Sequence, residues 1–352
     1  MNLLYNVIGI AGTAKNTGKT TTTNYLLDIF KKRGLSTGLT SIGYDGERLD
    51  NVTGLPKPRI PVSVNTTVAV AKRCLPVSTA HIHIIKETPI STPLGNIIIG
   101  KVEKEGLAVV AGPNKSSDLR VVINELKRLD LDIILVDGAL NRLAPMVETE
   151  GFILATGAAR SPDITRLAYE THSIAYLFGL PQFKERLSTE VIIQNGFRKK
   201  HWMGFSSLFT NRQLSELLER LTPETIRLEI PGVVQEKLWK QLGEYIIAND
   251  LKFDICVADP IKLALAGSVG NVHRLFERLE NYGVKLLVAQ KLPLVAVTVN
   301  PFFPKYRFEV QDYEPAYVDG GKLVGAIAKA ISVPAIDIKR NGDMLIKALF
   351  TG

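Results

Sequence analysis

Cysteine is scarce in this chain, whose 352 residues include only Cys74 and Cys256. The two lie far apart, and neither has a second cysteine or a histidine at metal-ligand spacing. This scarcity argues against a disulfide framework and against a zinc site, and it is typical of proteins from a reducing compartment. We therefore expect a cytoplasmic protein.

Long apolar runs are also missing. No run approaches the ~18–20 residues that a membrane-spanning helix needs, so we expect no membrane association. The first apolar run, Val7-Ile8-Gly9-Ile10-Ala11, leads directly into a glycine-containing loop. We interpret it as a core strand and not as a signal peptide.

A concentrated basic surface is absent as well. The net charge of +8 suits anionic partners such as nucleotides, but the basic residues are scattered. The densest cluster is Arg198-Lys199-Lys200-His201-Trp202, which is too short for a nucleic-acid footprint and is typical of a solvated loop or a partner-docking site. We therefore expect no nucleic-acid partner.

The length of the chain predicts two domains.

The most informative segment follows the first apolar run and precedes a helical pattern over residues 21–33. A strand, a glycine-containing loop ending in Gly-Lys-Thr and a helix are typical of a phosphate-binding loop (P-loop), whose N–H groups form an anion nest. Lys19 would neutralise the β- and γ-phosphates, and the Thr20 hydroxyl would bind Mg²⁺. Lys15 is either a solvated charge or a phosphate contact. The predicted nucleotide-binding residues are Gly12, Thr13, Ala14, Lys15, Asn16, Thr17, Gly18, Lys19, Thr20 and Thr21.

Two carboxylates follow predicted strands in the same region. Leu39 to Ile42 is followed by Asp45 and Glu47, and the apolar run Leu131 to Val136 ends at Asp137, which is the Walker B pattern. Because ligands collect at the carboxyl ends of parallel strands, we expect Asp45 and Asp137 to bind Mg²⁺ with Thr20, and Lys19, Asp45 and Asp137 to be the catalytic residues. An acidic Asp-Gly turn is the alternative for Asp45.

A further strand, residues 151–159, leads into Arg160, which could reach a nucleotide phosphate. The alternation of strands and helices up to about residue 177 predicts an α/β fold with a doubly wound, mostly parallel sheet. Alternating runs between residues 81 and 111 predict an antiparallel, β-rich insertion. We expect a P-loop nucleotide-binding domain over residues 1–180 and a second α/β domain over 185–352 that binds a partner or substrate. In that second domain, Asp259 and Asn300 end apolar runs and are the candidate ligand residues.

The Gly12 to Thr20 loop resembles that of dethiobiotin synthetase and of the cobyrinic acid amidase-type synthetases, which share a class with the MinD/ParA ATPases. MinD-like ATPases carry an additional lysine at the position of Ala14. Asp137-Gly138-Ala139 resembles the Glu-Gly-Ala-like sequence of dethiobiotin synthetase and its relatives, with a carboxylate side chain that is shorter by one methylene.

The loop, residues 40–47 and residues 136–142 also resemble the P-loop component that accompanies lysine 5,6-aminomutase. That resemblance implies a reactivating ATPase that helps to exchange damaged adenosylcobalamin on a client enzyme.

Two functions therefore remain open. The first is an Mg-ATP-dependent ATPase, a hydrolase that acts as an accessory factor for a partner protein, and a homodimer would be in keeping with its class. The second is an ATP-dependent synthetase of the dethiobiotin synthetase type that activates a carboxylate or carbamate. Against the second, Ile42-Gly43-Tyr44-Asp45 replaces the Lys-Pro of dethiobiotin synthetase, and the sequence shows no glutaminase Cys–His pair. ATP is expected over GTP because no guanine-specificity motif is apparent.

Overall fold

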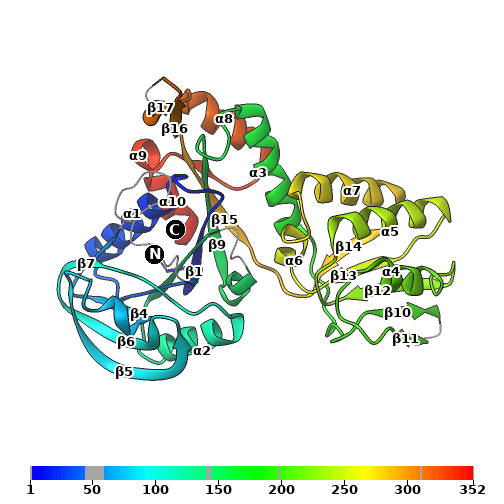
Figure 1. Cartoon of the computed structure of the whole chain (residues 1–352), viewed down its shortest axis with the longest axis horizontal. Coiled ribbons are helices and arrows are strands. Elements are labelled where there is room, and N and C mark those ends of the chain that lie inside the picture. The colour runs from blue at the N-terminus through cyan, green and yellow to red at the C-terminus, as the bar shows by residue number, and fades with distance from the viewer. Residues whose placement is uncertain (1, 44–58, 140–143, 197–198, 310, 352) are drawn as a thin grey trace. The chain divides into compact units, whose positions relative to one another are not determined.

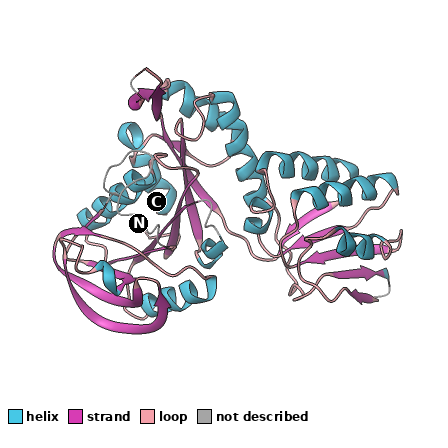
Figure 2. Ribbon diagram, in the orientation of Figure 1, coloured by secondary structure: helices cyan, strands magenta, loops and turns pink. Residues whose placement is uncertain are grey.

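The chain forms two compact units. The computed structural model describes residues 2–43, 59–139, 144–196, 199–309 and 311–351. Unit 1 consists of Met1–Ala168 and Leu294–Gly352, and unit 2 of Tyr169–Pro293. Strands and helices alternate along most of both units (Figure 2), so the protein belongs to the α/β class.

Unit 1 is built on a nine-stranded sheet (Figure 1). The first seven strands in the order below are parallel, and the last two form an antiparallel hairpin, which is the predicted β-rich insertion. The spatial order is β18 (Ala335–Ile336), β15 (Leu294–Asn300), β9 (Gly151–Gly157), β1 (Val7–Gly12), β8 (Ile133–Ala139), β2 (Thr37–Ser41), β4 (Thr66–Ala71), β6 (Gly95–Lys104) and β5 (His81–Thr92).

The first strand is central because it is apolar on both faces. Every residue of β1 is buried, as expected for a parallel strand whose two faces are both covered. A side chain on Gly9 would overlap the sulfur of Met146, whereas one on Gly12 would approach Lys19 and Thr17. Since residues 9 and 12 point to opposite faces, the η3 segment (Ala144–Glu148) covers one face and the start of helix α1 covers the other.

Helix α1 (Lys19–Lys32) buries one stripe of side chains. The buried positions recur every three or four residues, which is the period of a helix that packs one face on a sheet. Phe30 on this stripe meets Phe350 edge to face, with 6.5 Å between ring centroids. The stripe consists of Thr22, Thr23, Leu26, Leu27 and Phe30.

The remaining elements of unit 1 connect or cover the sheet. A small hairpin, β16–β17, follows β15 and carries an edge-to-face pair, Phe302 and Tyr317, at 5.6 Å. These elements are β3 (Ile60–Val62), η1 (Lys72–Cys74), β7 (Gly106–Ala108), α2 (Ser116–Lys127), β16 (Phe302–Arg307), β17 (Asp312–Tyr317), α8 (Gly320–Ala330), α9 (Ile338–Asn341) and α10 (Asp343–Leu349).

Unit 2 contains a five-stranded sheet and most of helix α3 (Ile164–Gly179). The strand order is β11 (Lys200–Trp202), β10 (Ile192–Asn195), β12 (Thr225–Ile230), β13 (Asp254–Val257) and β14 (Lys285–Val288). The last three strands are parallel, and β10 runs antiparallel to β12. Its other helices are α4 (Asn211–Leu218), α5 (Glu236–Ala248), α6 (Pro260–Ala264) and α7 (Val269–Tyr282).

The division of the chain differs from the expected boundaries of 1–180 and 185–352. Residues 294–352 return to unit 1, where β15 pairs with β9 and β18 pairs with β15. The apolar run of β15 predicted a strand correctly, but both of its faces are buried and it needs a neighbour on each edge. The edge of the unit 1 sheet at β9 supplies that neighbour.

None of the described helices is both long enough and apolar enough to cross a lipid bilayer.

Candidate functional site

The loop between β1 and α1 begins with a buried strand end and stops at a helix N-terminus. Two of its residues have left-handed backbone conformations, Asn16 with φ +64° and Gly18 with φ +92°. Gly18 is the N-cap of α1, and no side chain caps the helix there. The first turn of α1 contains no acidic residue. The backbone N–H groups at this end are therefore left for an anion from outside the helix.

Threonine hydroxyls hold the loop in place. Thr13 donates its backbone N–H to the carbonyl oxygen of Ala155 at 2.9 Å, and its hydroxyl lies 2.9 Å from that of Thr156 on β9. Within the loop, the Thr17 hydroxyl donates to the carbonyl oxygen of Ala14 at 2.9 Å. The loop is thus fixed both to the neighbouring strand and across itself, which preorganises it for a ligand.

Lys19 and Asp137 form an ion pair across the carboxyl edge of the sheet. The Lys19 ammonium lies 2.7 Å from Oδ2 of Asp137, and the side chains are 27% and 14% exposed. The Thr23 hydroxyl donates to the other carboxylate oxygen of Asp137 at 3.4 Å. The predicted Walker B carboxylate therefore lies directly beside the predicted phosphate-binding lysine.

Thr20 is half-buried in the first turn of α1. Among the described residues, its hydroxyl has no hydrogen-bond partner. An unpaired hydroxyl and a carboxylate oxygen close to one helix N-terminus are the oxygen ligands that Mg²⁺ takes in phosphate-binding loops. The residues present thus fit a Mg²⁺–phosphate group.

A cavity of about 310 Å³ lies beside the loop, within unit 1. Asn300 links its two sides, because its side-chain N–H donates to the carbonyl oxygen of Asn16 at 2.8 Å. On the floor, the Thr22 and Thr298 hydroxyls are 2.8 Å apart and buried. The lining residues are Thr17, Gly18, Thr21, Thr22, Thr298, Val299, Asn300, Pro301, Phe302, Tyr317, Asp337, Ile338 and Lys339.

The structure places the other predicted residues as follows. Ala14 is half-buried and Lys15 is exposed in the loop. Arg160 follows β9 in a turn closed by its own N–H to Gly157, at the same end of the strand that contacts Thr13. The described residues do not include Asp45, Glu47 or residues 140–142, the last part of the 136–142 segment that resembles the aminomutase component. The metal role of Asp45 therefore stays a prediction.

Several cavity residues were missed in the sequence. The sequence pattern carries no signal for Thr298, Phe302, Tyr317 or Asp337, and it predicts Asn300 in the second domain, whereas Asn300 lies in unit 1. The only available signal was an apolar run ending in Asn-Pro, which resembles the end of any strand in a parallel sheet. Its place beside the loop follows from strand order, which the pattern does not contain.

Asp259, the other candidate of the second half, is buried at the N-cap of α6 and accepts the backbone N–H of Lys262 at 3.0 Å. Burial raises the pKa of this carboxyl. Capping accounts for its position, and a ligand role for it stays a prediction.

Comparisons with known proteins give distant similarities only. No protein-family model and no curated protein matches the chain. A crystal structure of the signal recognition particle receptor FtsY from Elizabethkingia anophelis is 10% identical with a TM-score of 0.21; it matches 91% of this chain, which spans 64% of that receptor. The MinC:MinD cell division complex of Aquifex aeolicus is 12% identical with a TM-score of 0.28; the match covers 78% of this chain and 96% of the chain of the complex. The structure of pNOB8 ParA bound to nonspecific DNA is 12% identical with a TM-score of 0.29; the match covers 79% of this chain and 98% of the ParA chain.

At these similarities we draw nothing about substrate, partner or activity from the three structures. The resemblance to dethiobiotin synthetase and to the aminomutase component stays a prediction from motifs.

Proposed function

We propose that this chain binds Mg-ATP at the loop between β1 and α1 and hydrolyses it. The observation that carries the proposal is the Lys19–Asp137 pair at 2.7 Å, which lies at the uncapped N-terminus of α1. A lysine and a carboxylate at this place are the two charges that a P-loop needs, one for phosphate oxygens and one for the metal.

Each part of the nucleotide has residues suited to it. The loop N–H groups and Lys19 would bind the β- and γ-phosphates, and the adjoining cavity, lined by Asn300 and Tyr317, would take the nucleoside. Thr20 and Asp137 would hold Mg²⁺, which supplies charge neutralisation on the phosphates. Lys19 would then exchange the Asp137 carboxylate for phosphate oxygens.

The finer proposal is an accessory ATPase that acts on a client enzyme. It is supported by the resemblance of the loop and Walker B motifs to the P-loop component of lysine 5,6-aminomutase, which makes an adenosylcobalamin-dependent aminomutase the client to test first. The nucleotide would bias which conformations of the chain bind that client.

The nucleotide site is tested by calorimetry. We expect Lys19→Ala to remove measurable Mg-ATP binding, because Lys19 is the first residue of α1 and its ammonium lies beside Asp137 at the carboxyl edge of the sheet. Lys32→Ala is the control, since that lysine lies at the far end of α1 and pairs with Asp28. Unchanged ATP affinity in Lys19→Ala would refute the site. A parallel GTP titration tests the base preference.

The client is tested by capture on the immobilised protein. We expect a purified adenosylcobalamin-dependent aminomutase to bind in one nucleotide state, with a non-hydrolysable ATP analogue or with ADP, and not to bind Lys19→Ala in that state-dependent way. Binding that ignores the nucleotide, or no binding, would refute the accessory role while leaving the ATP site intact.

A further inference from the structure

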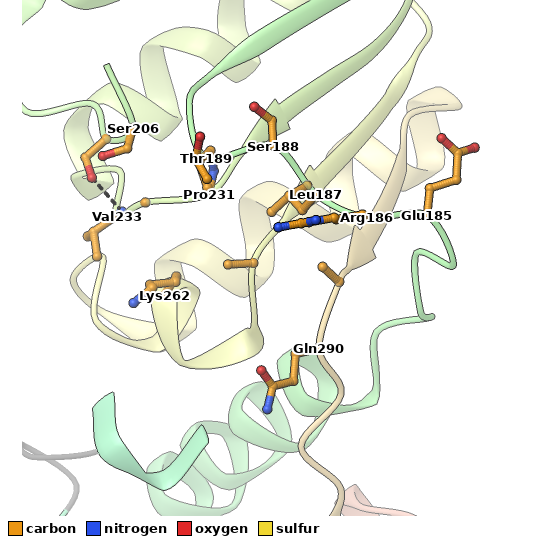
Figure 3. Close-up of a pocket in the computed structure, with 14 residues that line it drawn as sticks. Glu185, Arg186, Leu187, Ser188, Thr189, Ser206, Pro231, Val233, Lys262 and Gln290 are labelled. Atoms are coloured by element: carbon orange, nitrogen blue, oxygen red, sulfur yellow. Dashed lines mark hydrogen bonds between the residues drawn. The ribbon is translucent and has the colours of Figure 1, made fainter. Parts of the chain in front are cut away.

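Unit 2 contains a second cavity, of about 620 Å³, to which the proposed ATP site gives no role. Figure 3 shows its lining residues, and all of them belong to unit 2. They are Glu185, Arg186, Leu187, Ser188, Thr189, Ser206, Ser207, Pro231, Gly232, Val233, Ala258, Lys262, Ala289 and Gln290.

The cavity lies at the carboxyl edge of the second sheet. Residues 231–233 follow β12, Ala258 follows β13, and residues 289–290 follow β14. Because β10 runs antiparallel to β12, residues 185–189, which precede β10, reach the same edge. The crevice outside the carboxyl ends of parallel strands is where open α/β sheets bind ligands.

The charges on the cavity wall leave a positive excess. The charge of Glu185 is paired with that of Arg227, because both carboxylate oxygens of Glu185 accept N–H groups of Arg227, at 2.9 and 3.2 Å. Arg186 and Lys262 form no ion pair within 4 Å of any described carboxylate. In Figure 3 the Arg186 guanidinium extends from its own segment toward the loops after β12 and β13. Two cations thus line one cavity without a direct ion pair to a described carboxylate, and Lys262 lies close enough to the buried Asp259 to interact with its charge.

Hydroxyl groups complete the wall. The Ser188 oxygen accepts the backbone N–H of Glu190 at 3.1 Å, and the Ser207 oxygen accepts that of Val233 at 3.2 Å. A hydroxyl that accepts a backbone N–H still has its own proton to donate. These two serines can therefore donate to an oxygen ligand without losing the bonds that hold them.

Gly232 allows the serine segment to come this close. Its backbone N–H donates to the carbonyl oxygen of Ser206 at 2.7 Å. A side chain at Gly232 would overlap both that oxygen and the Ser207 hydroxyl, so another residue here would push the segment away. The close approach brings hydroxyl donors and the loop after β12 to one wall of the cavity.

We propose that this cavity binds a small molecule through an oxyanion, either a phosphate or a carboxylate group. Arg186 and Lys262 supply charge, and the hydroxyls of Ser188 and Ser207 supply directed donors. The apolar wall formed by Leu187, Pro231 and Val233 would pack against the carbon skeleton of the ligand. The site needs nothing from the loop between β1 and α1.

The test is an amide chemical-shift titration of the full ¹⁵N-labelled chain. Inorganic phosphate and malonate are the probes, and sodium chloride at equal ionic strength is the reference. We expect saturable shifts in residues 186–189, 206–208 and 231–233 with at least one probe. The same shifts should appear in Lys19→Ala, which separates this site from the proposed ATP site. The probe that saturates at lower concentration identifies the oxyanion.

Matched variants decide whether the cations bind the probe. Arg186→Gln and Lys262→Gln should each weaken binding on the order of tenfold, the loss of one charge-assisted contact. Arg220→Gln and Lys237→Gln remove exposed cations elsewhere in unit 2 and should leave the titration unchanged. Shifts that fail to saturate with both probes would overturn the proposal, as would cavity variants that titrate like the controls. The spectra report the folding of each variant.

Discussion

The side chain of Asn300 donates a hydrogen bond to the carbonyl oxygen of Asn16 at 2.8 Å, across 284 positions of sequence. Asn16 has a left-handed backbone conformation with φ +64°, and this bond holds it in the loop. A Cβ on Gly18 would also approach that of Asn300 at 3.3 Å. The end of β15 therefore shapes the loop and lines the adjoining cavity at once.

We expect Asn300→Ala to weaken ATP binding about tenfold and inorganic pyrophosphate binding much less, because Asn300 lines the cavity assigned to the nucleoside. Calorimetry with both ligands measures the ratio. Asn271→Ala, a change on helix α7 of unit 2, is the control. Equal losses for the two ligands would show that Asn300 acts only by holding the loop.

We expect Asp137→Asn to keep the fold and to lower Mg²⁺-dependent ATP hydrolysis by about a hundredfold or more, since the amide is a poor metal ligand and no longer carries charge. Steady-state phosphate release measures the loss. Asp132→Asn is the control, because that exposed carboxylate precedes β8 at its other end and accepts from Ser36. Turnover retained in Asp137→Asn would place the metal ligand elsewhere.

The buried hydroxyl pair of Thr22 and Thr298 should couple the loop helix to β15. We expect Thr22→Val to lower the free energy of unfolding by about 1–3 kcal/mol, because it leaves the buried Thr298 hydroxyl without its partner. Thr298→Val should lower it less, because the Thr22 hydroxyl keeps its bond to the carbonyl oxygen of Gly18 at 3.1 Å. The double variant should lose clearly less than the two single losses combined. Urea unfolding measures all three, and strict additivity would show that the pair does not interact.

His273 makes the stability of unit 2 depend on pH. Its ring is buried, and Nδ1 lies 3.1 Å from the Ser173 hydroxyl. Burial, and then the charges of His172 and Arg274, lower the pKa of His273, while Glu277 opposes the shift. The unfolded chain therefore binds the proton more readily. The stabilisation is complete above the unfolded pKa of about 6.5 and is lost as pH falls below it, at up to about 1.4 kcal/mol per pH unit.

Urea unfolding of the protein and of His273→Phe between pH 5 and 8 tests this. Phenylalanine keeps the ring, and Ser173 retains its bond to the carbonyl oxygen of Tyr169. We expect the variant to lose the decline in stability below pH 6.5. The same decline in both proteins would assign the effect to other groups.

The loop and its two charges could be predicted from the sequence because the signals are local. An apolar run, a Gly-Lys-Thr sequence and a helical pattern after it predict the strand, the loop and the helix of residues 7–32, although contacts from β9 and β15 hold the loop in its conformation. Asp137 could be added because parallel strands end at one edge of a sheet, so the last residue of a second apolar run arrives near Lys19.

The partners of that loop were decided by tertiary structure. The residues 294–352 carry the same alternation of strands and helices as unit 2, and the pattern does not say which sheet edge a strand will join. The edge of β15 pairs with β9, and in that position both faces of β15 are buried. This pairing brings Thr298, Asn300 and Asp337 to the cavity. Local residue chemistry determined the loop between β1 and α1; the pairing of distant strands, which depends on the burial of whole faces, decided what surrounds it.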